Sequence, residues 1–539
     1  MRLQTITTQV SVSAAFLLAA AFPTLAQTPK PGGVYAVVGA RIEIGDGRVI
    51  EKGTVVIRDG IIESVAVDTK PPADAEVIKG DGLTVYPGFI NAYTAKGLTL
   101  PDPIPNQDTA PDISAEASPS MRLANRKGVR PELKAADILA LTDEILKPER
   151  QAGFTTDLIA PGGGTISGTA SLVNLNGLTR RDCVLRPEVM IDCSLGSSGG
   201  GYPGSAMGII AFTRQTLLDA QHYHDLVVSY AHGGPERPPD DPTLASLQPL
   251  VSGAIPALYT ANTEREIRRV AAIADEFKLK LRINGGAEAF KAISLLKSKD
   301  IAVVLSLNFG QEPGVTPTPQ GNGPVGAGGG PGGRTPGGRR RGGQGGQPGA
   351  APGAAPGGAP TGAPAGAPAG RPANPAPNTP AAPPTTPPAG DGAAPAAVQD
   401  DAPPAVIAER HKKWEEKVAN AAALEKAGVP FALTTSGVRN QAEFMTNLRK
   451  AIKAGLSRAA ALQALTLNAA KLFSVDKHLG TVTPGKLAAI TVMNGDFADE
   501  KSTVQYLFID RQKFEPGKDV GPIVAAPQRR RPGVDDDSP

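Results

Sequence analysis

The 539-residue chain lacks the features that would assign it to several large functional classes. Its formal charge is only +3, from 55 basic and 52 acidic residues, so the charge balance gives no case for nucleic-acid binding. Beyond residue 22 no apolar run reaches the roughly 18 residues needed to span a membrane. The triplet Gly162–Gly164 is not followed by the Gly-Lys-Ser/Thr of a phosphate-binding loop. Nucleic-acid binding, membrane spanning and P-loop chemistry are therefore not predicted.

Cysteine is scarce as well, because Cys183 and Cys193 are the only two in the chain. If residues 184–192 form one extended strand, its ends lie ~30 Å apart, too far for a disulfide. A hairpin in this segment would bring the thiols together, and an oxidising compartment would permit the bond. We favour two buried free thiols.

The first 26 residues are typical of an export signal. Arg2 supplies a positive charge, residues 10–22 form a short apolar core, and Thr24–Ala26 offers small residues for cleavage. The apolar core is shorter than the ~18 residues of a membrane anchor. We expect cleavage after residue 26 and a protein that is exported to the periplasm or the cell exterior.

Short β-rich segments occur at both ends of the chain, and strands alternate with helices between them. The terminal segments, punctuated by turns such as Asp59-Gly60, predict one small β-sandwich domain built from both termini. The middle region predicts a parallel α/β fold, a (β/α)8 TIM-type barrel. The terminal strands are expected at Val34–Val38, Ala40–Ile44, Thr54–Arg58, Ile61–Val65, Gly480–Val482, Ala488–Met493 and Gln505–Ile509. The eight barrel strands are expected at Phe89–Tyr93, Phe154–Ile159, Ala170–Leu175, Glu188–Cys193, Ile255–Thr260, Leu279–Asn284, Ile301–Leu307 and Val429–Thr435.

A low-complexity segment, residues 310–405, interrupts the barrel and is rich in Gly, Pro and Ala. Such a composition cannot bury enough apolar surface to offset chain entropy, so the segment is predicted to be disordered. A tolerated loop expansion is favoured over a tether or a basic arm, because loop-closure entropy rises slowly with length. The predicted organisation is a signal peptide (1–26), the first part of the β domain (33–86), the first part of the barrel (87–309), the insert (310–405), the last part of the barrel (406–476), the last part of the β domain (477–515) and a disordered tail (516–539).

Three stretches resemble the amidohydrolase superfamily, near its imidazolonepropionase-like branch. Residues 455–488 match the pattern AGLSPxxALxAxTxNxAxxLG…LGxxxPGKxAD in order and spacing, apart from Ala489, where the family usually has Asp. Residues 85–98 resemble the first barrel strand, PGxIDxHxH, through Pro87, Gly88, Ile90 and Asn91. Residues 162–168 are similar to a GxxxSG loop of some exported members. The resemblance implies a barrel with a composite β domain.

For active relatives the resemblance implies one or two metal ions, such as zinc, at the barrel mouth. The metal lowers the pKa of bound water from ~15.7 towards ~7, and an Asp after the eighth strand relays the proton. The other ligands are a His-x-His, a carboxylated Lys and two further histidines. In this chain the corresponding positions hold Tyr93, Ala95, Cys193, Thr260, Asn284 and Ser436. We therefore expect no metal, no cofactor and no catalytic residue at these positions, and we expect the six residues to line a pocket.

The five histidines do not predict a replacement metal site. His222 and His224 lie in residues 214–230, which predict an amphipathic helix, and side chains two residues apart on a helix face nearly opposite directions. His232, His411 and His478 are interpreted as surface or helix-packing residues.

These observations favour an exported pseudo-hydrolase that binds a small amide-bearing or peptide-like ligand without metal-dependent turnover. Family resemblance alone implies instead a working hydrolase of non-peptide carbon–nitrogen bonds. A third alternative is a scaffold subunit that forms a homo-oligomer or pairs with an active paralogue. The fold by itself does not decide among them.

Overall fold

The computed structural model describes residues 33–67, 69–101, 128–196, 203–313 and 402–516. The predictions for the export signal, for residues 314–401 of the insert and for the tail from residue 517 lie outside these ranges. The predicted insert extends too far, because its last two residues, 404 and 405, already belong to helix α8 (Pro404–Val418).

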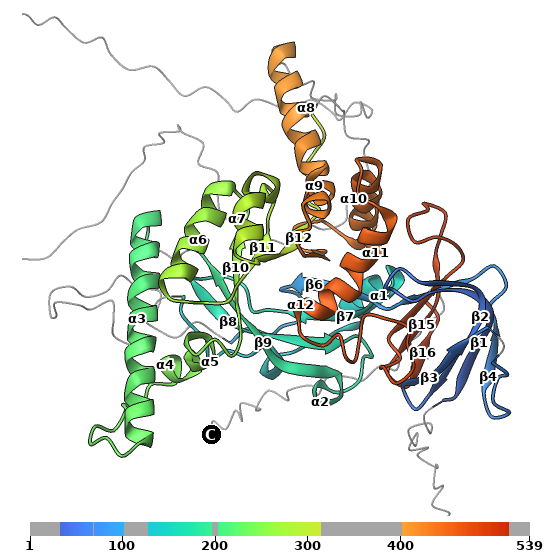
Figure 1. Ribbon diagram of the computed structural model, residues 1–539, viewed down its shortest axis with the longest axis horizontal. Coiled ribbons are helices and arrows are strands. Elements are labelled where there is room, and N and C mark those ends of the chain that lie inside the picture. The colour runs from blue at the N-terminus through green and yellow to red at the C-terminus, as the bar shows by residue number, and fades with distance from the viewer. Residues whose placement is uncertain (1–32, 68, 102–127, 197–202, 314–401, 517–539) are drawn as a thin grey trace, which may run out of the picture. The chain divides into compact units, whose positions relative to one another are not determined.

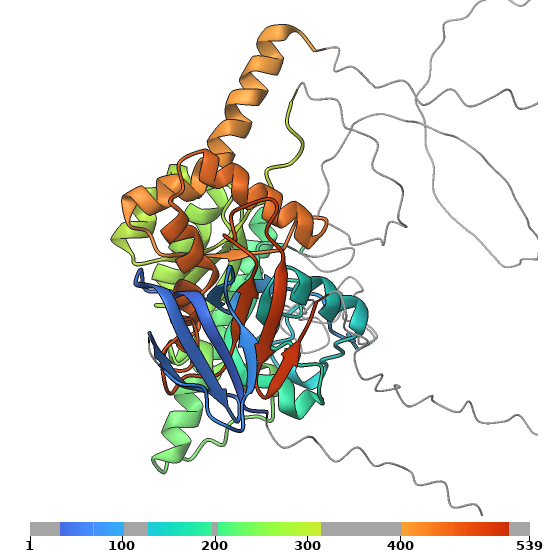
Figure 2. The same ribbon diagram turned by 90° about the vertical axis from the view of Figure 1, so that its right-hand side faces the viewer.

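Strands from the two ends of the chain form a single sheet, in which blue and red strands lie side by side (Figures 1 and 2). Asp59 and Gly60 both have positive φ, 52° and 78°, as a two-residue hairpin turn of the type I′ class requires. Residues 480–482 are not a strand as predicted, because Val482 donates a lone backbone bond to Ile44. The order is β16 (Gln512–Phe514), β15 (Val504–Ile509), β14 (Ile490–Met493), β5 (Thr84–Pro87), β1 (Tyr35–Glu43), β2 (Val49–Arg58) and β3 (Ile61–Ala66), with β4 (Glu76–Lys79) beside β1.

A second sheet of eight strands forms the barrel, and each strand overlaps one that the sequence predicts. The strands, in spatial as well as chain order, are β6 (Phe89–Thr94), β7 (Phe154–Ile159), β8 (Ile166–Asn174), β9 (Val184–Ser194), β10 (Ala257–Ala261), β11 (Leu281–Gly285), β12 (Ala302–Ser306) and β13 (Phe431–Thr434). The mixed α/β barrel fold is confirmed, but β8 is antiparallel to both neighbours. Only residues 160–165 separate β7 from β8, and a parallel connection needs a crossover of a dozen residues or more.

The first and last barrel strands, β6 and β13, are joined by side chains in place of a strand ladder. The amide nitrogen of Asn91 donates to the Thr435 hydroxyl at 2.9 Å. Its oxygen accepts from the Thr435 backbone at 3.0 Å and from the Thr434 hydroxyl at 3.2 Å. Asn91 thus uses both ends of its amide to hold the barrel nearly closed.

Alternate residues of the barrel strands pack into two separate apolar clusters, as the two-residue period of a strand requires. Met190, Leu258 and Val304 belong to the inner cluster. Ile191 and Tyr259 belong to a larger cluster that includes side chains of the surrounding helices. This alternation decides which strand residues face the barrel interior.

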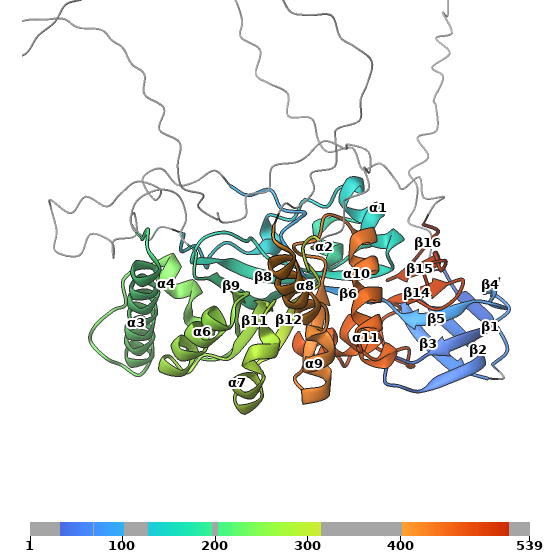
Figure 3. The same cartoon turned by 90° about the horizontal axis from the view of Figure 1, so that it is seen from above.

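Helices pack on the outer face of the strands, as seen from above in Figure 3. The Thr263 hydroxyl and the Glu266 carboxylate cap the start of α6 reciprocally. The helices are α1 (Asp143–Gln151), α2 (Arg180–Cys183), α3 (Ala206–Ala231), α4 (Pro242–Ser246), α5 (Gln248–Val251), α6 (Glu264–Glu276), α7 (Ile293–Ser298), α8, α9 (Asn420–Ala427), α10 (Gln441–Lys453), α11 (Arg458–Leu465) and α12 (Leu467–Leu472), with short 3-10 turns at Ala135–Asp137 and Ala289–Ala292. In the described ranges, no helix combines the length and hydropathy needed to cross a membrane.

Candidate functional site

A carboxyl group and a phenol meet inside the barrel where β6 and β9 end. The Tyr93 hydroxyl donates to Oδ2 of Asp192 at 3.3 Å, and both side chains are buried, with 7% and 2% of their surface exposed. Ser167 and the backbone of Gly162 are further neutral polar groups that act on the Asp192 carboxyl. Burial raises the pKa of Asp192 to about 7, because removal from water disfavours the charged form more than these neutral partners favour it.

The glycine loop between β7 and β8 lies against this pair. Gly162, Gly163 and Gly164 have φ of 66°, 78° and 84°, a left-handed conformation that other residues adopt with strain. The Ser194 hydroxyl fixes the loop by donating to the Gly164 carbonyl at 2.6 Å. A Cβ atom at Gly162 would lie 3.3 Å from the Cβ of Ala95. Ala95 itself is exposed, so it does not line a buried pocket as predicted.

Two more of the predicted residues, Thr260 and Asn284, lie together on neighbouring strands. The Asn284 amide nitrogen donates to the Thr260 hydroxyl at 3.0 Å. This fixes the opposite end of the amide, and Oδ1 of Asn284 is buried with no hydrogen-bond partner among the described residues. Oδ1 of Asp192 is likewise buried with no hydrogen-bond partner among the described residues. Buried acceptors are nearly always bonded in folded proteins, so these two oxygens point to donors supplied from elsewhere.

Ser436 follows β13, and hydrogen bonds of its backbone amide and carbonyl fix its position. Its amide donates to the Thr434 hydroxyl at 3.0 Å, and its carbonyl accepts from the Ser306 hydroxyl at 2.7 Å. The Thr434 hydroxyl in turn donates to the carbonyl of Tyr93. Ser436 is thus connected to the same end of the barrel as Tyr93, through Thr434.

Cys193 does not face the interior where the prediction put it. It lies on the opposite face of β9, in the outer cluster with Ile191 and Tyr259, and only 1% of its surface is exposed. Its neighbour Asp192 takes the inward position, because successive residues of a strand point to opposite faces. Burial raises the pKa of the Cys193 thiol well above its usual range. Cys183 is also buried and free.

Sequence reasoning missed Asp192 and Ser167, although one signal for Asp192 was available. It is a carboxylate within the apolar strand 188–193, and a charged residue in such a run is rarely buried without a purpose. The sequence did not show which residues of this strand face inward. In the structure Met190 packs in the inner cluster and Ile191 in the outer one, so Asp192 faces inward.

The residues that surround this site do not fit a catalytic zinc ion. Zinc takes Cys, His, Asp or Glu ligands, usually three from the protein. Among the described residues, the group of this kind that bonds Tyr93 is Asp192. In the part of the chain that the structure describes, no three such side chains lie close enough to hold a metal. His222 and His224 are on helix α3 as predicted, and His224 bonds Gln248 at 2.8 Å.

A second pair of buried carboxyls, Glu149 of α1 and Asp157 of β7, lies behind the barrel wall. Gln441 donates to Glu149 at 2.8 Å, and one oxygen of each carboxyl has no partner among the described residues. Burial raises the pKa of Glu149 to about 7, and burial together with the Glu149 charge raises that of Asp157 well above its usual range. This pair interacts with Asn91 and Lys96, and not with Asp192.

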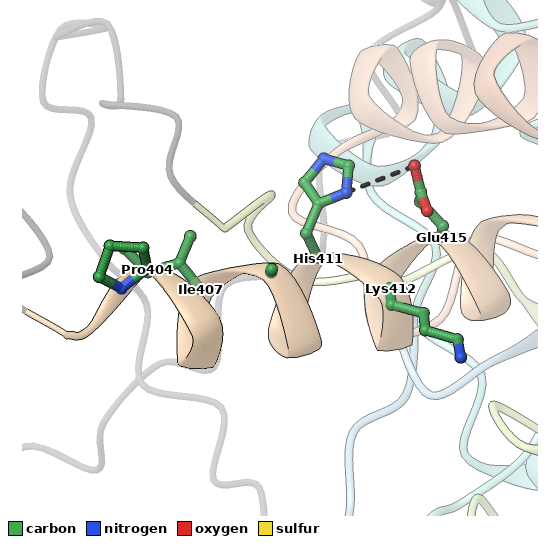
Figure 4. A pocket seen from close by; sticks show the side chains of 6 residues that line it. Pro404, Ile407, His411, Lys412 and Glu415 are labelled. Atoms are coloured by element: carbon green, nitrogen blue, oxygen red, sulfur yellow. Dashed lines mark ion pairs between the residues drawn. The ribbon is translucent and has the colours of Figure 1, made fainter.

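Two surface hollows lie away from the barrel interior. One, of about 500 Å³, runs along α8, where Ile407 lies beside His411 and where His411 forms an ion pair with Glu415 at 3.3 Å (Figure 4). The other, of about 510 Å³, is in the terminal sheet between Ile50, Val65 and the segment around Pro484. Neither contains any of the six residues predicted to line the site.

Comparison with known proteins identifies the C-terminal region and the fold. The model of the amidohydrolase family matches residues 403–513. A 5'-deoxyadenosine deaminase from Methanosarcina mazei is 49% identical over 51 residues, which are 10% of this chain and 12% of that enzyme. The amidohydrolase of Thermotoga maritima MSB8 superposes with a TM-score of 0.62 at 19% identity, over 89% of this chain and 100% of that one. A Xaa-Pro dipeptidase with bound methionine reaches a TM-score of 0.43 at 13% identity, over 90% of this chain and 100% of that one.

Proposed function

We propose that this chain, whose residues 403–513 match the amidohydrolase family, binds a small amide-bearing or peptide-like ligand at the barrel mouth without a catalytic metal. The mouth is the end of the barrel that carries Tyr93, Asp192, Thr260, Asn284 and Ser436. The deaminase relative acts on a carbon–nitrogen bond by its name. In the proposed function this chain keeps the ligand pocket but does not cleave such a bond with a metal.

The observation that carries the proposal is the pair of unfilled acceptors, Oδ1 of Asp192 and Oδ1 of Asn284. An unmade hydrogen bond on a buried oxygen costs about 1–3 kcal/mol, so a ligand that supplies N–H groups recovers this cost on binding. An amide presents such N–H groups. Among the described residues at the mouth, Tyr93, Thr260, Asn284 and Ser436 have polar side chains that are not usual zinc ligands, and Asp192 adds a carboxyl. This set suits hydrogen bonding better than coordination.

We also propose export, on the strength of residues 1–26 alone. The positive residue, short apolar core and small-residue cleavage site follow the usual order of a secretory signal. Fractionation of cells that express the full chain should recover a protein starting at Gln27 outside the cytoplasm. A cytoplasmic product that keeps its first 26 residues would refute export.

The test of the binding function begins with the chain lacking residues 1–26. After incubation with zinc and gel filtration, elemental analysis should find well below one zinc per chain. A panel of dipeptides and cyclic amides should then contain compounds that raise the melting temperature. Stoichiometric zinc together with hydrolysis of cyclic imides or acyl-dipeptides would overturn the proposal and restore the active hydrolase.

A matched pair of variants places the ligand. Asn284→Ala removes one of the unfilled acceptors and should abolish most of the ligand-induced rise in melting temperature. Asn447→Ala is the control, because Asn447 is also a buried asparagine but donates to the Leu307 carbonyl from α10. An equal loss in both variants would mean that the effect is general destabilisation.

A further inference from the structure

The Asp192 carboxyl is buried without a positively charged partner. The Tyr93 phenol donates to it, and the other polar groups that act on its pKa, a hydroxyl and a backbone amide, are also neutral. It forms no ion pair among the described residues. Arg282 of β11 lies two strands from Asp192 at the same level of the sheet. It donates to the carbonyls of Leu281 and Asp300, and its Nε has no partner among the described residues. A buried carboxylate is normally paired, so the complement of Asp192 is missing from this part of the chain.

Asn284 provides a second acceptor on the same face of the sheet. In the strand register Asn284 lies beside Thr260, and Thr260 lies beside Ser194, two residues beyond Asp192. Two strand spacings amount to about 10 Å and two residues to about 7 Å along the strand. Both residues lie on the same face of the sheet, so their side chains extend from the strands in the same direction. The two oxygens therefore suit two nitrogen groups of one small molecule.

We propose, resting on the binding function above, that Asp192 anchors a protonated amino group of the ligand while Asn284 accepts from an adjacent amide N–H. The ligand class is then a small cation with a free amino terminus, such as a dipeptide. A neutral amide can fill the same acceptor but supplies no charge to stabilise the ionised carboxyl. The ammonium group would donate to Oδ1 of Asp192, while Oδ2 keeps its bond from Tyr93.

Binding of such a cation is coupled to loss of a proton from Asp192. With its pKa at about 7, the carboxyl is largely protonated at pH 5.5. An ammonium ion stabilises the ionised form, so the proton leaves for the solvent as the ligand binds. The titratable groups beside Asp192 are Tyr93 and Cys193, whose pKa values are both raised well above their usual range, so neither ionises between pH 5 and 7.5.

The experiment compares two probes by isothermal titration calorimetry, alanyl-alanine and N-acetyl-alanyl-alanine. Alanyl-alanine should bind at least tenfold more tightly at pH 7. Its affinity should rise by roughly tenfold from pH 5.5 to pH 7, the range over which a carboxyl of pKa about 7 becomes half ionised. Titration in buffers of different ionisation enthalpy should detect release of nearly one proton at pH 5.5.

Two isosteric substitutions separate a role in binding from a role in folding. Asp192→Asn should remove both the preference for the free amine and the pH dependence. Asp157→Asn, at a buried aspartate that interacts with Glu149 instead, should keep both. Melting temperatures of both variants show whether each is folded before the titrations are compared.

The outcomes distinguish the two proposals. Equal binding of both dipeptides, or a pH dependence that persists in Asp192→Asn, overturns the anchoring role and leaves metal-free binding standing. Absence of binding for both dipeptides counts against the binding function itself, and the anchoring role fails with it. Preference for the free amine that is lost only in Asp192→Asn supports both.

Discussion

The most direct consequence of the buried Asp192 carboxyl is a cost in stability that grows as the pH rises. Its folded pKa, about 7, lies above its ordinary value of 3.8. Between these values the folded chain holds a proton that the unfolded chain has released. The free energy of unfolding must then fall as the pH rises from about 4 to about 7, and it becomes level above that range.

The magnitude follows from the two pKa values. Each pKa unit corresponds to about 1.4 kcal/mol, and the values differ by about three units, so the cost at pH 7.5 approaches ~4 kcal/mol. Asp192→Asn keeps the size and the acceptor but cannot ionise. Relative to wild type, the variant should gain about 3–4 kcal/mol between pH 4 and pH 7.5.

The assay is urea unfolding followed by circular dichroism at four pH values from 4 to 7.5. Only the difference between variant and wild type is used, because other groups, such as Glu149, titrate in the same range. Asp225→Asn, at an exposed position on α3, is the control and should give a flat difference. A flat difference for Asp192→Asn as well would refute the reasoning and mean that the carboxyl is hydrated and ionised in the folded chain.

Three further substitutions test other parts of the structure. Glu149→Gln removes a buried carboxyl whose pKa is raised to about 7, so unfolding free energies measured in urea should show a gain of up to about 3 kcal/mol over wild type between pH 4.5 and 7.5. The same gain at every pH would contradict this. Arg458→Met removes the ion pairs of Arg458, one of them with the buried Glu43 at 3.1 Å, and should lower the stability by about 2 kcal/mol. A Glu43→Gln background should reduce this loss, and an unchanged loss would exclude the pair as its cause. Gly164→Ala would bring a Cβ to 2.7 Å from a backbone oxygen, whereas Gly163→Ala has open space at nearly the same φ. In both variants the left-handed conformation costs about 1 kcal/mol, but thermal unfolding should show a clearly larger loss of stability for Gly164→Ala. Equal losses would mean that the loop moves aside.

Much of the fold could be predicted from local signals. Apolar runs bounded by turns located all eight barrel strands, and Asp59-Gly60 marked a hairpin that the structure confirms. These succeed because strand period and turn chemistry are local properties of the chain. The antiparallel direction of β8 also follows from the short link 160–165, which is too short for the crossover of a regular parallel barrel.

The site was predicted less well, since its key residue depends on the phase of a strand. The position of Tyr93 followed from a motif, and Thr260 and Asn284 do lie together. For β9 the comparison with the family motif predicted that Cys193 faces inward, but the residue that faces inward is Asp192. Neighbouring strand residues differ by half a turn, and an apolar strand buried on both faces has no polar alternation that would reveal which is inward.

The sequence by itself determined where the barrel strands lie, that β segments from both termini come together, and the absence of histidines from the positions of the family motif. These depend on residue type and spacing along the chain. Only the tertiary structure decided that one oxygen of the Asp192 carboxyl and the Asn284 amide oxygen are buried without a partner among the described residues. That property depends on what surrounds each atom once strands distant in the sequence are brought together, and burial without a partner gives each oxygen its need for a donor.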